Sequence, residues 1–188
     1  MTTQAKQQIN GVDVNQLMET VGAIEDNENL ATFRFRARTE WVDGGRARTE
    51  IQDFYGAGQE DESRSEPFVL EGDEPPVLLG TNQAPNAVEA VLHAVASCLS
   101  VGFIYNAAAQ GITVDALDFE LEGELDLRAF LGLSDEVRPG YEGITVNYRV
   151  EADAPPEKID ELCEYVQRTS PVLDIVRNPV PVTVQRVA

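Results

Sequence analysis

The stretch of sequence that decides the fold runs from residue 85 to residue 105 and reads PNAVEAVLHAVASCLSVGFIY. It lies in the most apolar part of the chain and predicts a long helix over roughly 86–109, ended by a glycine stop at Gly111. A helix that is apolar nearly all round must be covered on every side, by a sheet, by a second helix and by a partner subunit. Polar residues, including Glu89 and His93, interrupt the run. We therefore expect a buried helix of a soluble protein rather than a membrane span.

The segments on either side of this helix predict an α+β fold. Before it, helical spacing follows an N-cap at Asp13, and alternating residues then form a hairpin around a turn. The expected elements, in order, are a helix over 13–24, hairpin arms over 30–42 and 46–55, a solvated loop over 57–66, a short strand over 68–70, the long helix, strands over 112–130 and 141–152, a helix over about 156–168, a helical turn over 172–177, and a final strand around 180–187. Strands punctuated by helices in this order are typical of α+β proteins.

The charge of the chain is its most unusual bulk property. Its 188 residues include 33 acidic and 14 basic side chains, which gives a formal net charge of −19. Only Lys6 and Lys158 are lysines. An acidic, lysine-poor surface stays hydrated in concentrated salt, so we interpret the source as halophilic, against the alternative of an ordinary acidic cytosolic protein. Nucleic acid and anionic membranes are excluded as partners, because both require a basic patch.

The two cysteines define the candidate chemistry. Cys98 and Cys163 are too few for a disulfide framework, and with one histidine they cannot build a closed zinc site, so we expect no metal and no cofactor. The first residues do not read as a signal peptide, and we expect a cytoplasmic protein. A thiol beside a cation can be a nucleophile, whereas a buried one is usually inert packing. Both readings of Cys98 remain open on these grounds.

The residues around Cys98 resemble the OsmC/Ohr family of osmotically induced and organic-hydroperoxide-resistance proteins. The similarity lies in Gly80-Thr81-Asn82 and in the run from Pro85 to Leu99, and again in 169–174 and 178–182. It covers roughly residues 30–188, so we divide the chain into an N-terminal helical extension (1–28) and an OsmC-like domain (29–188). The resemblance implies two curved antiparallel sheets around long buried central helices, in an intertwined homodimer with active sites at the subunit interface.

The resemblance also implies roles for individual residues. Cys98 matches the cysteine that attacks the peroxide, and an arginine from the N-terminal hairpin, Arg46 or Arg48, together with Glu89, would polarise its thiol. Peroxidase members carry a second, disulfide-forming cysteine where this chain has Ser170, and they carry the glutamate one position further from the cysteine than Glu89 lies. These departures favour the OsmC-like branch of the family and weaken the two-cysteine mechanism.

Helix geometry limits which residues can reach the Cys98 thiol. Glu89 lies about 13 Å from Cys98 along one helix and on its opposite side, so we also consider it an acid that favours the helix N-terminus. His93 is expected to be a buried, hydrogen-bonded histidine that lines the pocket. Ser170 is expected to cap the chain before a proline and to line any pocket near Cys98. Cys163 is expected to be core, about 10 Å along its helix from Ser170.

Two functions fit these residues. The first is an OsmC-like thiol-dependent reduction of organic hydroperoxides, in which Cys98 becomes a sulfenic acid that an external thiol reduces. The second is a non-catalytic OsmC-like dimer that binds a small apolar ligand at its interface, with Cys98 as packing. The serine at position 170 favours the second, and the retained Cys98 with its two candidate arginines favours the first.

Overall fold

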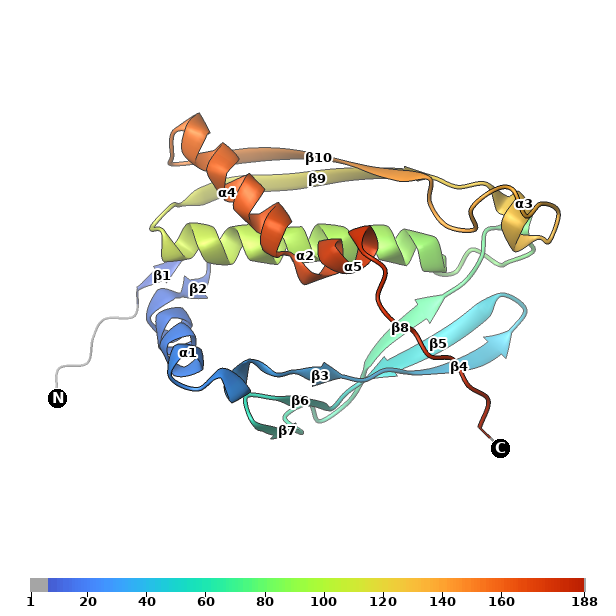
Figure 1. Ribbon diagram of the computed structural model, residues 1–188, viewed down its shortest axis with the longest axis horizontal. Coiled ribbons are helices and arrows are strands. Elements are labelled where there is room, and N and C mark those ends of the chain that lie inside the picture. The colour runs from blue at the N-terminus through green and yellow to red at the C-terminus, as the bar shows by residue number, and fades with distance from the viewer. Residues whose placement is uncertain (1–6, 188) are drawn as a thin grey trace. The chain divides into compact units, whose positions relative to one another are not determined.

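The computed structural model describes residues 7–187 and has an α+β architecture with antiparallel sheets (Figure 1), which confirms the predicted fold class. The described chain divides into two compact units. The first unit comprises residue 7 and residues 13–91, and the second comprises residues 8–12 and 92–187. The long helix α2 (Ala87–Ala109) begins in the first unit and continues through the second.

The first unit is built from short strands. Its first helix α1 (Val14–Asp26) is capped as predicted, because the Asp13 side chain accepts a hydrogen bond from the Gln16 N–H at 3.2 Å. The 3-10 turns η1 (Glu28–Ala31) and η2 (Pro76–Leu78) flank two three-stranded sheets. One sheet has the order β3 (Arg34–Phe35), β6 (Phe54–Gly56), β7 (Gln59–Asp61), and the other β4 (Arg38–Asp43), β5 (Arg46–Ile51), β8 (Phe68–Gly72).

The β4–β5–β8 sheet has one charged face and one apolar face, because side chains alternate along a strand. Its register places Arg48 between Glu40 on β4 and Glu71 on β8. The opposite face carries Trp41 and Leu70, which are 74% and 57% exposed. Within the described chain, every buried apolar side chain belongs to the second unit. The first unit therefore leaves an apolar sheet face uncovered by its own side chains.

A buried carboxylate organises the loop that follows β8. Asp73 is 2% exposed, and its two oxygens accept hydrogen bonds from the Thr81 hydroxyl at 2.6 Å, from the Gln83 N–H at 3.0 Å and from the Glu74 N–H at 2.8 Å. These donors, the Thr81 hydroxyl first among them, hold the pKa of Asp73 far below its usual range. Asp73 thus fixes the segment from Gly80 onward, which leads into α2.

Replacing this carboxylate is expected to destabilise the first unit. Asp73→Asn presents amide hydrogens to donors that need an acceptor, and we expect the melting temperature at pH 7 to fall by about 5 °C or more. Because the folded-state pKa is lowered, the stabilisation is complete above the ordinary aspartate pKa of about 4 and is lost as the pH falls through the folded-state value. The difference in melting temperature between Asp73→Asn and the wild type should therefore be constant from pH 5 to 8 and shrink only in strong acid. Thermal melts with the exposed Asp53→Asn as control test this, and equal melts at pH 7 for both variants would contradict it.

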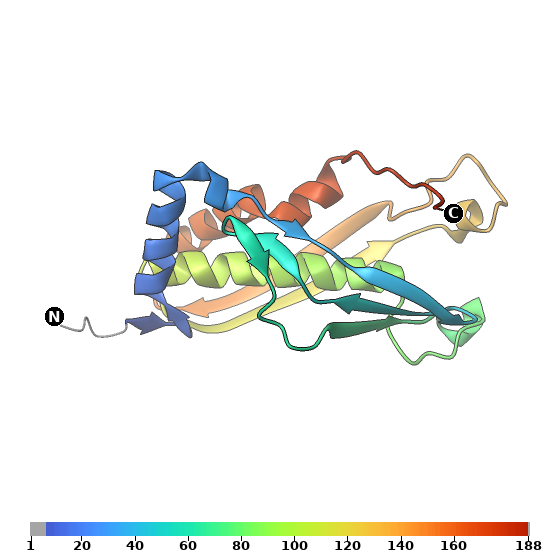
Figure 2. The same cartoon turned by 90° about the horizontal axis from the view of Figure 1, so that it is seen from below.

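The second unit contains the long elements. The hairpin of β9 (Val114–Glu124) and β10 (Gly143–Ala152) lies beside α2, α4 (Pro156–Thr169) and α5 (Pro171–Arg177) (Figures 1 and 2), and α3 (Leu127–Phe130) lies in the connection between its strands. A small hairpin of β1 (Gln8–Ile9) and β2 (Val12–Asp13) is hydrogen-bonded to the chain at the start of β9. The Asn10 side chain donates to the Ile112 carbonyl and accepts from the Val114 N–H, both at 2.9 Å.

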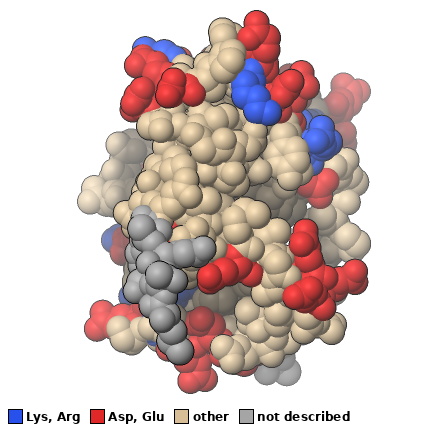
Figure 3. Space-filling view, turned by 90° about the vertical axis from the view of Figure 1, so that its left-hand side faces the viewer, with Lys and Arg blue, Asp and Glu red and all other residues tan. Residues whose placement is uncertain are grey.

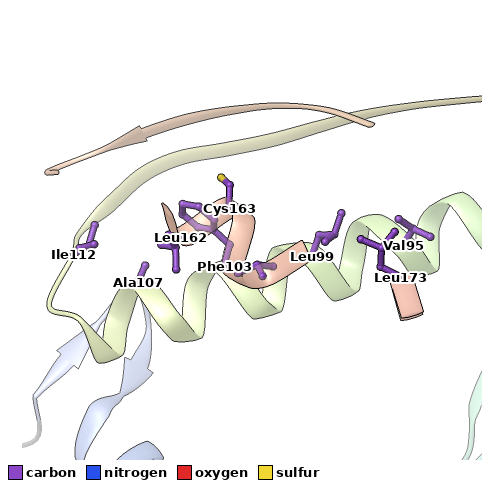
Figure 4. Packing of buried hydrophobic residues seen from close by; sticks show 9 residues of the cluster. Val95, Leu99, Phe103, Ala107, Ile112, Leu162, Cys163 and Leu173 are labelled. Carbon is purple, nitrogen blue, oxygen red and sulfur yellow. The ribbon is translucent and has the colours of Figure 1, made fainter. Parts of the chain in front are cut away.

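The hydrophobic core also lies in the second unit (Figure 4). Its buried members come from α2, α4, α5 and the turn before β9, and they are Val95, Leu99, Phe103, Ala107, Ile112, Leu162, Cys163, Val166 and Leu173. Side chains from the inner face of the β9–β10 hairpin, among them Leu117 and Phe119, pack against this cluster. The helix α2 is therefore buried along one stripe only. Of the predicted cover, the sheet and the second helix are confirmed, and the face with Val101 and Tyr105, which are 54% and 47% exposed, is where the predicted partner subunit would lie.

Several predicted boundaries differ from the structure. The arm expected over 30–42 is split into β3 and β4, and the loop expected over 57–66 contains the short strand β7. The final strand expected around 180–187 is wrong, because residues 180–187 pair with no strand within the described chain. A strand forms only where its backbone finds a partner, and the alternating valines of this segment find none.

Candidate active site

Cys98 lies in the middle of α2, between the core residues Val95 and Leu99. It is a free thiol, and the residue is half-buried. The core residues on either side fix the orientation of this turn of the helix. The thiol therefore lies next to the apolar core.

Ser170 is the side chain that the structure brings to this thiol. Its hydroxyl donates a hydrogen bond to the Cys98 Sγ over 3.1 Å, and its oxygen accepts the Leu173 N–H at 3.2 Å. Ser170 ends α4 and is the N-cap of α5, directly before Pro171, which confirms the predicted cap. It is 5% exposed. Of the predicted site residues, Cys98 and Ser170 are therefore in direct contact.

A glycine allows the two helices to approach closely next to this contact. A Cβ atom at Gly102 would lie 3.0 Å from the Val166 Cγ1. Gly102 follows Cys98 by one helical turn, and Val166 precedes Ser170 by one turn. The close crossing of α2 and α4 therefore sets Ser170 against the thiol. Gly102 is not among the residues predicted for the site, although a lone glycine inside a helix is a signal of close approach.

Arg46 and Arg48, the candidate cations, lie on β5 in the first unit, whereas Cys98 lies in the second. Arg46 forms an ion pair with Glu71 at 3.4 Å, and Arg48 forms one with Glu50 at 2.5 Å. Both arginines point to the charged face of their sheet. Each guanidinium thus already has a carboxylate partner within its own unit.

Glu89 acts as a cap at the beginning of α2. Its carboxylate accepts the Asn86 N–H at 2.8 Å, and the Asn86 side chain accepts the Glu89 N–H at 2.9 Å. This reciprocal pair is a capping box, which satisfies two amide groups at the helix N-terminus. It agrees with the reading of Glu89 as an acid that stabilises the helix start.

His93 is exposed, so the expectation of a buried histidine is wrong. Its Nε2 lies 3.4 Å from the Ser97 hydroxyl, one turn further along the same helix. The two side chains belong to the face of α2 that carries Val101 and Tyr105 rather than to the core stripe.

The second cysteine is directed away from the site. The sulfur of Cys163 points toward the β9–β10 strands and away from α2 (Figure 4). Burial raises the pKa of the Cys163 thiol, and its hydrogen bond with the Tyr148 hydroxyl, followed by desolvation, raises the pKa of Tyr148 to about 12. Cys163 is thus a neutral core thiol at pH 7, as predicted, and its partner Tyr148 was not foreseen. No group of three or more potential metal ligands gathers anywhere in residues 7–187.

The chain belongs to the OsmC family, because the family profile, described as OsmC-like protein, matches residues 80–185. The match includes α2 with Cys98, both strands of the β9–β10 hairpin, and the helices that position Ser170. Within the described residues, α2 is the one helix long and apolar enough to span a membrane by length and composition, and one stripe of it belongs to the hydrophobic core.

Solved structures with the same fold include three OsmC-like proteins. An OsmC-like protein from Mycoplasma pneumoniae is 14% identical, with 78% of this chain and 89% of that chain covered and a TM-score of 0.58. An OsmC-like protein of unknown function from Vibrio cholerae is 12% identical, with coverages of 75% and 92% and a TM-score of 0.55. A Legionella pneumophila protein described as the organic hydroperoxide resistance protein OsmC is 15% identical, with coverages of 77% and 89% and a TM-score of 0.53. No curated protein sequence matches this chain.

Proposed function

We propose that this protein reduces organic hydroperoxides through Cys98. The Cys98 thiolate attacks the distal peroxide oxygen, the O–O bond breaks, and the alkoxide leaves and takes up a proton, which yields a sulfenic acid and an alcohol. A first external thiol then forms a mixed disulfide with Cys98 and releases water. A second external thiol attacks this mixed disulfide and releases reduced Cys98, and the two external thiols leave joined as a disulfide.

The observation that carries this proposal is the contact between the half-buried Cys98 sulfur and the Ser170 hydroxyl. A hydrogen bond donated to sulfur favours the thiolate, which is the nucleophile. The family assignment supports the same reaction class, since the Legionella relative is described as a hydroperoxide resistance protein. An external reductant is part of the proposal, and it is supported by Ser170, which cannot form a disulfide, and by the Cys163 sulfur, which is turned toward the strands.

Arg46 or Arg48 is proposed as the cation that faces the thiolate. To do so, Arg46 would have to leave its ion pair with Glu71, or Arg48 its ion pair with Glu50, and pair with the Cys98 thiolate instead. Exposed ion pairs of this kind contribute only about 0–1 kcal/mol to stability, so breaking one costs little free energy. Glu89 is proposed to act from the partner subunit, because it cannot reach Cys98 along its own helix.

A direct test follows the oxidation of each cysteine by mass spectrometry. Reduced protein is mixed with cumene hydroperoxide and a sulfenic acid trap, and Cys98→Ser serves as the control. We expect trapped sulfenic acid at Cys98, none at the buried Cys163, and turnover on addition of a small thiol. Oxidation of Cys98 no faster than that of a free thiol would overturn the proposal.

The second candidate function is a non-catalytic dimer that binds a small apolar ligand. It is favoured by the serine in place of a second cysteine and by the ion pairs that occupy both arginines. Wild type and Cys98→Ser would then bind such a ligand equally and would show no turnover with hydroperoxide. The same mass spectrometric assay therefore separates the two functions.

We further propose that the protein is a homodimer. The exposed apolar surfaces of the described chain include the Trp41 and Leu70 face of the β4–β5–β8 sheet and the Val101 and Tyr105 face of α2. Exposed apolar area of this kind marks association sites.

We expect light scattering to give twice the chain mass of 20.6 kDa, and Val101→Glu to give the monomer. Phe130→Glu, at an apolar position on α3 that is 77% exposed against 54% for Val101, is the control and should remain dimeric. A monomeric wild type would contradict the proposal.

The acidic surface supports the proposal of a halophilic source. Figure 3 shows a face on which acidic side chains outnumber basic ones, in keeping with the net charge of −19. Salt screens repulsion among these carboxylates, so we expect the melting temperature to rise between 0.1 and 3 M potassium chloride. A melting temperature that is flat or falls with salt would contradict this.

A cytoplasmic location is also proposed, since it would keep Cys98 and Cys163 reduced.

A further inference from the structure

We infer that Ser170 is a positioning residue for the Cys98 sulfur, a role that deepens the proposed function and rests on it for its catalytic use. Its hydroxyl acts as a fixed hydrogen-bond donor that holds the sulfur in one orientation and favours the thiolate. The position that could have supplied a second cysteine thus supplies a donor instead.

The direction of the hydrogen bond follows from the chemistry of a hydroxyl group. A serine hydroxyl has one hydrogen to donate and two lone pairs to accept with. The Leu173 N–H occupies a lone pair of the Ser170 oxygen at 3.2 Å, and the Cys98 sulfur is 3.1 Å away. Ser170 is 5% exposed, so water has little access to compete. The hydroxyl hydrogen is therefore directed at the sulfur.

The backbone around Ser170 is held on both sides. The Ser170 N–H donates to the Val166 carbonyl at 2.9 Å and ends α4, while Pro171 begins α5 with a fixed φ. The neighbouring crossing at Gly102 holds α4 against α2. A donor held in this way needs no rearrangement when negative charge develops on the sulfur, which is the condition for effective electrostatic stabilisation.

This arrangement also bears on the fate of the oxidised cysteine. A serine forms no covalent bond with a sulfenic acid, and Cys163 faces the strands of its own unit. The sulfenic acid at Cys98 therefore persists until a low-molecular-weight thiol reaches it. Ser170 thus favours nucleophilic attack and at the same time keeps the site in a one-cysteine cycle.

Three substitutions separate the donor role from the cap role. Ser170→Ala removes both the donor and the cap, Ser170→Gly removes the donor but remains a tolerated N-cap, and Ser170→Thr keeps both. Each is compared with the wild type for the rate of Cys98 alkylation by iodoacetamide at pH 7 and for the rate of oxidation by cumene hydroperoxide. We expect both rates to fall about tenfold in the alanine and glycine variants and to recover in the threonine variant. Circular dichroism checks that all variants are folded.

The outcomes distinguish this inference from the proposed function. Alkylation of Ser170→Ala at the wild-type rate would overturn the donor role, even if hydroperoxide is reduced. A loss in the alanine variant that is absent in the glycine variant would assign the effect to the cap and would also overturn it. If the wild type fails to react with hydroperoxide while alkylation still falls in both variants, the donor role stands and the proposed function fails.

Discussion

Ser170→Cys is expected to give a protein that forms an internal disulfide with Cys98 when it is treated with an organic hydroperoxide. The Ser170 Oγ and the Cys98 Sγ lie 3.1 Å apart, and a disulfide needs about 2.0 Å between its sulfurs, so a small shift closes the bond. The bond joins positions 72 residues apart. A loop of that size should stabilise the oxidised variant by about 4 kcal/mol, which raises its melting temperature by about 10 °C.

Thiol counting after unfolding measures this result. The oxidised variant should retain one free thiol per chain, that of Cys163, whereas the wild type should form no internal disulfide. A matched control, Ser97→Cys, places a thiol next to Cys98 in sequence but on an exposed face of α2 and should not form the bond. Two free thiols together with a trapped sulfenic acid at Cys98 would show that the contact between the two helices is wrong, whereas three free thiols would show that Cys98 does not react with the hydroperoxide.

Phe103→Ala is expected to cause the largest loss of stability in the second unit. Phe103 is 2% exposed at the centre of the core formed by α2, α4 and the β9–β10 hairpin. Truncation of a buried phenylalanine removes its transfer free energy and leaves a cavity, for a total of about 3–5 kcal/mol.

Denaturant unfolding measures this loss, with Phe130→Ala as the matched control. Phe130 belongs to the same unit and is 77% exposed, so the same truncation there should change the free energy of unfolding by less than about 0.5 kcal/mol. Equal losses in the two variants would contradict the assignment of the core.

The elements that could be predicted from the sequence are those with a strong local pattern. The long apolar run, the caps at Asp13 and Ser170 and the alternation of the two long strands each carry their own signal, and each is confirmed. The strand expected over 112–130 is shorter than predicted, because β9 ends at Glu124 and α3 follows it. The 180–187 segment shows why pattern alone is insufficient. Its valines alternate as in a strand, but a strand also requires a backbone partner, which an isolated segment cannot specify.

The candidate site was predictable only in part. The family resemblance pointed to Cys98 and to the serine at position 170, and the two side chains are in contact. The resemblance could not show the direction of the hydrogen bond, because that depends on the Leu173 N–H, which donates to the Ser170 oxygen. His93 was misplaced because helical spacing does not reveal which face of an apolar helix receives the core.

The most direct test of the central claim is the rate at which the Cys98 thiol of the folded wild-type protein reacts with an organic hydroperoxide. The rate is measured under single-turnover conditions and compared with that of the same chain unfolded in urea, in which both thiols are free. The account predicts that Cys98 reacts about tenfold faster, or more, in the folded protein, while Cys163 becomes unreactive. A Cys98 rate that is the same or lower in the folded protein would contradict it.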